Sequence, residues 1–125
     1  MVDFGTATNI DVVDSDGYYI GGAIAPGLRI SMDALVARAA RIASIPLETP
    51  PHAIGRTTEE AVQSGAVLGT AAMVEGLVGR IRAELGAPEA RVIATGGLAN
   101  IVADSTNVFD VVDGQLTLKG ICEIA

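Results

Sequence analysis

An Asp-Gly turn between two apolar runs does most to restrict how this chain can fold. The turn occupies residues 14–17 (Asp-Ser-Asp-Gly) and separates the apolar residues 10–13 from a second run at 18–25. Asp-Gly flanked by apolar residues is the strongest short-range signal for a β-hairpin. We therefore predict a strand that turns back at Gly17 into a second strand, in which Gly21-Gly22 marks a bend or a close approach.

A cluster of small and polar residues lies just before the first apolar run. Within six residues the chain carries Asp3, Gly5, Thr6 and Thr8. A carboxylate can hold a hard cation, a glycine lets a ligand approach the backbone, and threonines offer hydroxyl and amide groups. These residue types suit a phosphate and its cation. The alternative is an ordinary hairpin strand whose threonines reflect β propensity alone, and the local pattern leaves both interpretations open.

Composition restricts the class of protein. The 125 residues suffice for one domain with a core, which we expect to be aliphatic because half the residues are apolar and only 3% aromatic. A formal charge of -7 opposes non-specific binding to nucleic acid or to an anionic membrane. The single cysteine, Cys122, excludes an internal disulfide. No signal peptide and no apolar run near the roughly 18 residues of a membrane span is apparent, so we expect a cytoplasmic protein with no membrane partner.

A first helix is predicted directly after Pro26-Gly27. Apolar residues at helical spacing predict the face that it turns to the core, and these are Leu28, Met32, Leu35, Ala39 and Ile42. Charged residues fall largely elsewhere and favour a solvated face over a site, namely Arg29, Asp33, Arg38 and Arg41. Of these, Arg29 fits the solvated face least well, so a site role stays open for it. The proline-rich residues 45–53 then predict an extended surface connection with an exposed His52.

A longer helix is predicted from Thr57 to about Leu85. Thr57 and Glu60 form a capping box at its start, and Gly86 ends it. Its interior carries a stripe of small residues spaced alternately by four and three, consisting of Gly65, Gly69, Ala72, Gly76, Gly79 and Ala83. Each glycine costs about 0.5–1 kcal/mol relative to alanine in a helix. We therefore expect another element of the fold, or a partner subunit, to approach this face closely.

The last third of the chain predicts a strand at 91–95, a helix at 98–104, a strand at 108–113 and a helix at 115–124. Gly96-Gly97 joins the first of these strands to its helix and leaves bare backbone at a helix N-terminus, a favourable place for phosphate. The same dipeptide is also common in plain tight connections. The order of elements predicts one α/β domain, residues 1–125, with a mixed β-sheet covered by helices.

Taken together, these segments resemble the C-terminal half of a type III pantothenate kinase, in the superfamily of acetate kinase, sugar kinases and actin. Five blocks carry the resemblance in the family's order and spacing: Asp-Phe-Gly-Thr-Ala-Thr at 3–8, Gly-Gly-Ala-Ile-Ala-Pro-Gly-Leu at 21–28, Ile-Gly-Arg-Thr-Thr at 54–58, Ala-Thr-Gly-Gly-Leu-Ala at 94–99 and Leu-Thr-Leu-Lys-Gly at 116–120. The resemblance implies one ribonuclease H-like half of the actin-like ATPase fold. It also implies ATP-dependent phosphorylation of pantothenate in coenzyme A biosynthesis.

The resemblance implies a role for each matching position. Asp3 matches a ligand of a monovalent cation, usually potassium, and Thr58 matches a threonine that contacts pantothenate. The ATP-binding positions are Gly5, Thr6, Gly96 and Gly97. Magnesium would accompany the ATP, and the family predicts a homodimer.

Two further motifs that the resemblance implies are absent from the sequence: a first phosphate loop of the type Asp-x-Gly-Asn-Thr, and a Gly-Ala-Asp-Arg segment whose aspartate is the general base. The nearest spare carboxylates, Asp11, Asp14 and Asp16, favour turn or strand-end roles. No catalytic residue is therefore assigned, and we expect no kinase activity from this chain alone. Met1, directly before the motif strand, suggests a truncated or engineered half-domain.

Two alternatives of a different class stay open. One is a stand-alone, non-catalytic module that binds nucleotide or associates with itself through the small-residue stripe. The other is a regulatory relative without kinase activity, because the family includes proteins named as transcriptional accessory factors.

Overall fold

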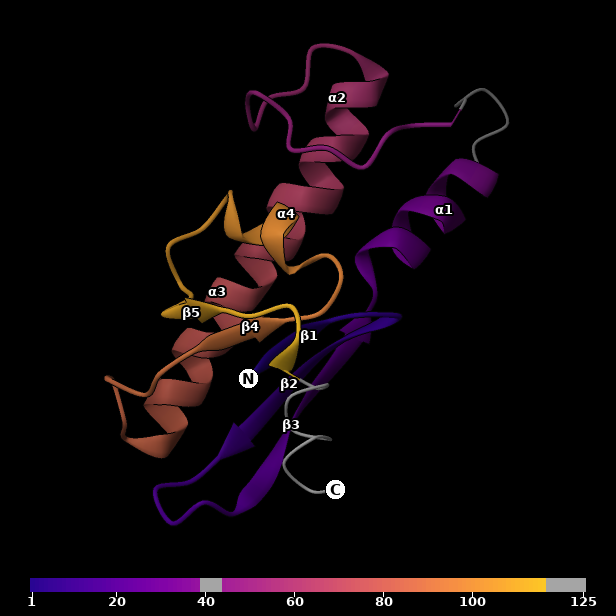
Figure 1. The fold of residues 1–125 in the computed structure, drawn as a ribbon. Helices are drawn as coiled ribbons and strands as arrows, with labels where there is room; N and C mark the ends of the chain where they lie inside the picture. Colours follow the sequence, from indigo (N-terminus) through magenta and orange to yellow (C-terminus); the bar gives the residue numbers. More distant parts are fainter. Residues whose placement is uncertain (39–43, 117–125) are drawn as a thin grey trace.

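The computed structural model describes residues 1–38 and 44–116 (Figure 1). Within these residues the elements follow in the order β1 (Val2–Phe4), β2 (Ala7–Val13), β3 (Tyr19–Pro26), α1 (Leu28–Arg38), α2 (Thr58–Gln63), the π-helical turn η1 (Ser64–Leu68), α3 (Gly69–Leu85), β4 (Ile93–Thr95), α4 (Ala99–Ala103) and β5 (Val111–Val112). The helix predicted at 115–124 and Cys122 fall almost entirely outside the described residues.

The strands form one mixed five-stranded sheet in the order β3-β2-β1-β4-β5. β2 pairs antiparallel with β1 and with β3, whereas β4 pairs parallel with β1 and with β5. The predicted α/β class and mixed sheet are therefore confirmed. β4 and β5 are shorter than the strands predicted at 91–95 and 108–113.

The predicted hairpin at Gly17 is confirmed. Oδ1 of Asp14 accepts hydrogen bonds from the backbone amides of Asp16 and Tyr18, each at 2.9 Å, and Gly17 has a φ of +87°. The bend predicted in the second strand is present as well. The pairing of β2 with β3 shifts register between Val12 and Val13, opposite Gly21, whose φ is +121°.

The polar cluster lies on and beside the strand that turns back at Gly17, as predicted, but it also spans a further turn that was not predicted. β1 ends at Phe4, the chain turns at Gly5 and Thr6, and β2 runs back beside β1 from Ala7. The amide of Gly5 donates to the carbonyl of Ala7 at 3.1 Å. The cluster thus wraps around a second, tighter turn, which carries neither Asn-Gly nor Asp-Gly and so gave no hairpin signal.

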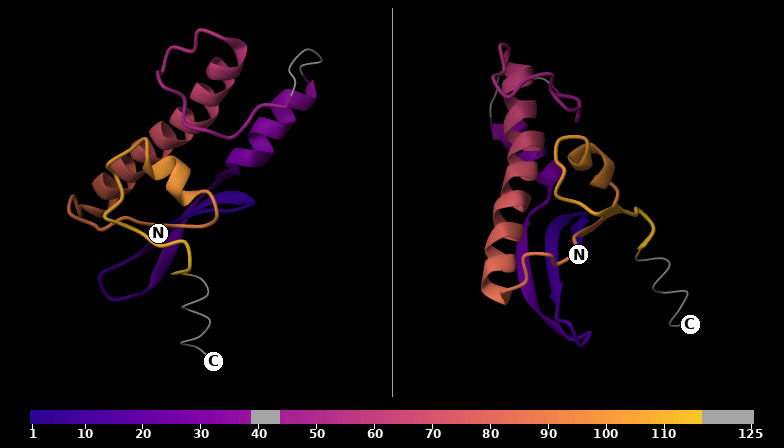
Figure 2. Two further views of the ribbon diagram at one scale, coloured as in Figure 1. Left: turned by 45° about the horizontal axis from the view of Figure 1, so that its top comes forward. Right: turned by 90° about the vertical axis from the view of Figure 1, so that its left-hand side faces the viewer.

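The predicted long helix is confirmed, with its cap. α2, η1 and α3 run without a break over Thr58–Leu85 along one face of the sheet (Figure 2, right). The amide of Glu60 donates to Oγ1 of Thr57 at 3.1 Å, and the Glu60 carboxylate accepts from the amide of Arg56 at 2.9 Å. The helix ends at Gly86, which has a φ of +62°. The π-helical turn was not predicted.

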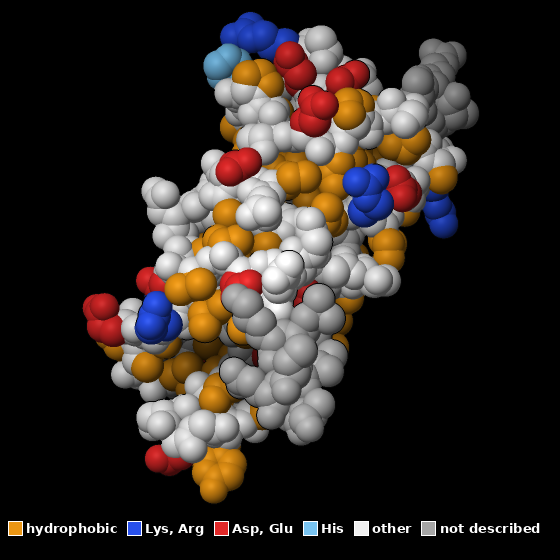
Figure 3. Space-filling model, in the orientation of Figure 1, with side chains coloured by type: hydrophobic (Ala, Val, Ile, Leu, Met, Phe, Trp, Pro, Cys, Tyr) orange, Lys and Arg blue, Asp and Glu red, His pale blue; other side chains and the backbone are white. Residues whose placement is uncertain are grey.

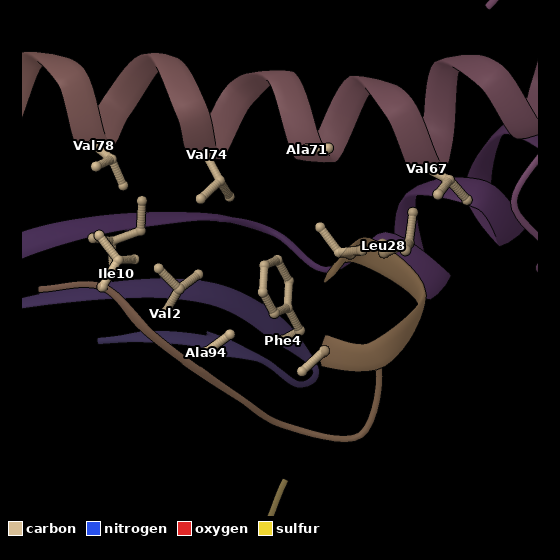
Figure 4. Close-up of a cluster of buried hydrophobic side chains, with 12 residues drawn as sticks. Val2, Phe4, Ile10, Leu28, Val67, Ala71, Val74, Val78 and Ala94 are labelled. Atoms are coloured by element: carbon tan, nitrogen blue, oxygen red, sulfur yellow. The ribbon is translucent and has the colours of Figure 1, made fainter. Parts of the chain in front are cut away.

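The core lies between this helix and the sheet (Figure 4). Four small aliphatic side chains of the helix point at the sheet: Val67, Ala71, Val74 and Val78. They meet buried side chains of the sheet, which are Val2, Phe4, Ile10 and Ala94. Phe4 also packs edge-on against Phe109, with ring centroids 5.8 Å apart. The expected aliphatic core is present.

The sequence analysis expected no apolar run long enough to span a membrane, and the long helix does not agree with that expectation. An 18-residue window within Thr58–Leu85 has a mean hydropathy of 1.3, so by length and composition alone this helix could cross a membrane. Its buried valines pack on the sheet, and 28% of that window is buried within the described residues.

Within the described part of the chain, no other element packs closely on the small-residue stripe, although Gly65 lines a hollow beside α1. All six of its residues are exposed, and a methyl group added at Gly65, Gly69, Gly76 or Gly79 would meet no atom within 4 Å. Close packing among residues 1–38 and 44–116 therefore does not explain these glycines.

The connection at 44–57 is extended, as predicted, and is tied to the long helix. Nε2 of the buried Gln63 donates to the carbonyl of Pro46 at 2.9 Å, and Oγ of Ser64 donates to the carbonyl of Ala53 at 2.6 Å. His52 is exposed, as expected. These bonds hold the connection beside the N-terminal part of the helix.

Candidate functional site

Asp3 lies at the centre of the sheet, on the face away from α3. Its neighbours Val2 and Phe4 point at α3, so the Asp3 side chain points to the opposite face. Asp3 pairs in register with Asn9 on β2 and with Thr95 on β4. Three polar side chains from three adjacent strands therefore form one row across this face.

The turn after β4 packs directly on β1. Gly96 has a φ of +99°, and a methyl group added there would lie 2.6 Å from both Oδ1 of Asp3 and the carbonyl oxygen of Phe4. The amide of Leu98 donates to that carbonyl at 3.3 Å. Only glycine fits this position, because the conformation is left-handed and the space is filled.

The Gly5–Thr6 turn has a second close neighbour, the start of α1. A methyl group added at Gly27 would overlap the carbonyl oxygen of Thr6 and lie 2.9 Å from that of Gly5. Gly27 precedes the first residue of α1, Leu28. The absence of a side chain at Gly27 therefore brings the N-terminal end of α1 against the backbone of the turn.

These contacts border an open pocket of about 370 Å³. It is bounded by the β1–β2 turn, the β4–α4 connection and the first turns of α1, and its lining residues are Phe4, Gly5, Thr6, Arg29, Ile30, Asp33, Gly97 and Leu98. Three of the four predicted ATP-binding residues line it. The fourth, Gly96, supports it from behind through its contact with Asp3 and Phe4.

Thr58 lies at a different hollow, of about 450 Å³, between α1 and the start of the long helix. Its walls are mostly apolar and comprise Ser31, Met32, Leu35, Thr58, Ala61, Val62, Gly65 and Ala66. On the face shown in Figure 3, hydrophobic side chains are visible between the regions of α1 and α2. The structure therefore separates Thr58 from Thr6, and α1 forms a wall of both hollows.

Helix α1 differs in part from its predicted pattern. Leu28 and Met32 are buried as expected, but Leu35 is 51% exposed, and Ala39 and Ile42 lie outside the described residues. Leu35 lines the Thr58 hollow rather than the core.

The donor chemistry around Asp3 suits a hard cation. The groups in the row Asn9, Asp3 and Thr95 include a carboxylate, an amide and a hydroxyl, and hard cations prefer such oxygen ligands. Among residues 1–38 and 44–116, no three His, Cys, Asp or Glu side chains gather as a metal site.

Thr8 takes no part in the pocket. Its side chain is buried on the α3 side of the sheet, and its hydroxyl donates to the carbonyl of Pro26 at 3.5 Å. Of the two threonines in the opening cluster, only Thr6 faces the pocket.

Sequence reasoning assigned no defined site role to four residues of this region: Asn9, Gly27, Arg29 and Thr95. Thr95 reaches Asp3 only through the parallel pairing of β1 with β4, for which a single sequence carries no signal. Gly27 was interpreted, together with Pro26, as the point where the second strand breaks, and its close approach to the Gly5–Thr6 turn was not predicted.

Comparisons with known proteins place these observations in a family. Residues 1–80 match the family model described as type III pantothenate kinase. The chain is 56% identical over 121 residues to a type III pantothenate kinase of Thermomicrobium roseum and 51% identical to one of Frankia alni. These alignments cover 97% of the chain but only 46% and 48% of the relatives, so the chain spans about half their length.

A solved structure supports the fold alone. It is titled a conserved putative Baf family transcriptional activator from Campylobacter jejuni, with a TM-score of 0.66 and 21% sequence identity. The match covers 98% of this chain and 54% of that one.

Proposed function

This chain belongs to the type III pantothenate kinase family, and we propose that it forms the nucleotide-binding half of an enzyme that phosphorylates the primary hydroxyl of pantothenate with ATP. The observation that carries this proposal is the pocket at which Gly5, Thr6 and Gly97 meet from two distant parts of the chain. Phosphoryl transfer depends mainly on positioning and on stabilising negative charge. A pocket bounded by glycine backbone and a threonine hydroxyl supplies such positioning.

Each ATP-binding residue has a physical role in the proposal. Gly5 and Thr6 form a tight turn whose exposed backbone and hydroxyl can bond phosphate oxygens. Gly97 has no side chain to block the pocket wall, and a methyl group there would meet no atom within 4 Å. Gly96 keeps that wall against β1. Together these residues would bind the phosphates and the adenosine side of ATP.

Asp3 would hold a monovalent cation, potassium by family resemblance. Asp3 precedes Phe4, which lines the pocket. In the sheet it pairs with Asn9 and Thr95, which carry polar side chains. A bound cation would supply positive charge close to the nucleotide, while magnesium would travel with ATP.

Thr58 would contact pantothenate in the hollow between α1 and the long helix. That hollow is mostly apolar with few polar groups, the usual character of a small-molecule site. The π-helical turn follows α2 directly, and such turns are frequent at functional sites.

At the level of the whole protein, we propose that residues 1–125 are one domain and correspond to the second domain of a cytoplasmic two-domain kinase. The mixed sheet with a long helix on one face is compatible with one ribonuclease H-like half of the actin-like ATPase fold. Its relatives' length, about twice that of the chain, supports this correspondence.

We expect no turnover from this chain alone, because the Gly-Ala-Asp-Arg segment that would supply the family's general base does not occur in this sequence. Asp14 already accepts two backbone hydrogen bonds in its turn, and Asp11 and Asp16 lie on or beside the same hairpin. A coupled assay with ATP, pantothenate and potassium tests this expectation. Clear turnover that Asp3→Ala abolishes would contradict it.

Nucleotide binding by the chain can be measured directly. ATP titrated into the isotope-labelled protein should shift the backbone amide resonances of Gly5, Thr6 and Gly97. Thr6→Val should weaken binding by about 10- to 150-fold, since a hydrogen bond to a charged group contributes about 1.5–3 kcal/mol. Thr49→Val, in the exposed connection, is the matched control. Shifts scattered over the surface, or none, would overturn the proposal.

A second proposal is that the chain forms a homodimer through the small-residue stripe. The supporting observation is that all its residues are exposed and uncharged on one face of an apolar helix. Analytical ultracentrifugation should detect a dimer that Gly69→Leu disrupts, because a leucine would separate closely packed helices. A strict monomer at high concentration would overturn this proposal.

A further inference from the structure

We propose that Arg29 binds the phosphate chain of the nucleotide, an inference that rests on the proposed function of the pocket beside the Gly5–Thr6 turn. Arg29 stands in the first turn of α1 and lines that pocket together with Gly5, Thr6 and Gly97. The sequence pattern favoured a solvated face for Arg29 but left a role in a site open.

The contact at Gly27 fixes where Arg29 stands. Gly27 touches the carbonyls of Gly5 and Thr6 without a side chain between them. The amide of Ser31 donates to the carbonyl of Gly27 at 2.9 Å, so the first turn of α1 is built on that same residue. Arg29, two residues after Gly27, is therefore held next to the turn by backbone contacts and not by a mobile loop.

The net negative charge of the protein makes a positive side chain beside the phosphates necessary, and Arg29 can supply it. With a formal charge of -7, the chain as a whole repels a polyphosphate, and a phosphate pocket needs local positive charge. Arg29 is the only basic residue among those that line the pocket. The fork of a guanidinium matches two phosphate oxygens at once, a geometry that favours arginine at such sites.

The guanidinium is available for a ligand. Arg29 is exposed, and within the described ranges no ion pair or hydrogen bond occupies its side chain. Asp33, one helical turn later, is the only acidic residue that lines the pocket. Its negative charge opposes phosphate binding, so Arg29 and Asp33 should affect nucleotide affinity with opposite signs.

Four variants of the full chain test the inference by calorimetry and by amide chemical shifts, with ATP and with inorganic tripolyphosphate as probes. Arg29→Gln should weaken the binding of both probes about tenfold, equivalent to about 1.4 kcal/mol. The affinity of Arg29→Lys for both probes should lie between that of Arg29→Gln and that of the wild type, because lysine keeps the positive charge but lacks the guanidinium fork. Asp33→Asn should strengthen the binding of both probes. Arg38→Gln, the exposed last residue of α1, should change neither.

The outcomes separate this inference from the proposed function. Suppose that the wild type binds ATP, that Thr6→Val weakens ATP binding, and that Arg29→Gln does not weaken it. The role of Arg29 is then overturned, whereas the nucleotide site is supported. If Arg29→Gln weakens ATP but not tripolyphosphate, Arg29 does not bind the phosphates and the inference is also overturned. If the wild type shifts no pocket amide with either probe, the proposed function fails and the inference falls with it. Amide spectra that match the wild type establish that each variant is folded.

Discussion

The α-carbon of Gly96 is packed against the carboxylate of Asp3, so that a methyl group at residue 96 would lie 2.6 Å from Oδ1 of Asp3. Two residues that are distant in the sequence are thus packed against each other. The same methyl group would also meet the carbonyl oxygen of Phe4 at 2.6 Å. The position of the β4–α4 turn therefore depends on the absence of a side chain at Gly96.

Gly96→Ala should destabilise the protein by about 2–4 kcal/mol, because it adds backbone strain at a positive φ to a steric clash. Urea unfolding measures the loss. Gly97→Ala is the matched control: its methyl group would meet no atom within 4 Å, and its stability should stay within about 0.5 kcal/mol of the wild type. Equal losses at both positions would contradict the packing described.

Thr57 and Thr58 are adjacent, yet their substitution should give different results. Thr57→Ala removes the cap that accepts the Glu60 amide and should cost about 1 kcal/mol in unfolding free energy. Thr58→Ala touches no cap and should change stability by less than about 0.5 kcal/mol, while lowering the affinity for pantothenate. Unfolding curves and pantothenate titrations on both variants distinguish them. A stability loss confined to Thr58→Ala would contradict the assignment of the cap.

Gly69→Ala should stabilise the folded monomer by about 0.5–1 kcal/mol, since alanine favours the helix and the added methyl group meets nothing. Thermal unfolding at a concentration low enough to prevent association measures the gain. Gly27→Ala serves as the contrasting variant, because its methyl group overlaps the Thr6 carbonyl and should destabilise. A loss of stability at Gly69 would mean that the stripe is not open.

Gln63→Leu should release the connection at 44–57. The substitution leaves the Pro46 carbonyl without its 2.9 Å hydrogen bond, and an unsatisfied partly buried carbonyl costs about 1–3 kcal/mol. Hydrogen exchange should increase around residues 45–49 more than in the sheet. Ser64→Ala removes the more exposed tether to Ala53 and should affect mainly the other end of the connection. Unchanged exchange in Gln63→Leu would show that Gln63 does not anchor it.

The parts of the fold that the sequence predicts are those governed by local rules. The Asp-Gly hairpin, the Thr57 cap and the Gly86 stop each depend on residues within one turn of one another. The Gly5–Thr6 turn was missed because no usual turn dipeptide marks it. The exposure of Gly69 and its neighbours was missed because spacing shows that residues share a face, but not what covers that face.

The candidate site was predicted only in part, for a related reason. The resemblance brought Asp3, Thr6 and Gly97 into one list, but their arrangement depends on the pairing of β1 with β4. A solvated face was favoured for Arg29 because helical spacing shows only that a residue points away from the core. Its position beside Thr6 follows from the Gly27 contact, which joins segments that are distant in sequence.

The position of α1 has a consequence for how two ligands would influence each other. One side of α1 borders the pocket at Thr6 and another borders the hollow at Thr58, while its start rests on the turn that would hold phosphate. A ligand that displaces α1 at either site therefore changes the shape of the other. Any resulting cooperativity must be mutual, because a coupling free energy raises or lowers both affinities by the same factor.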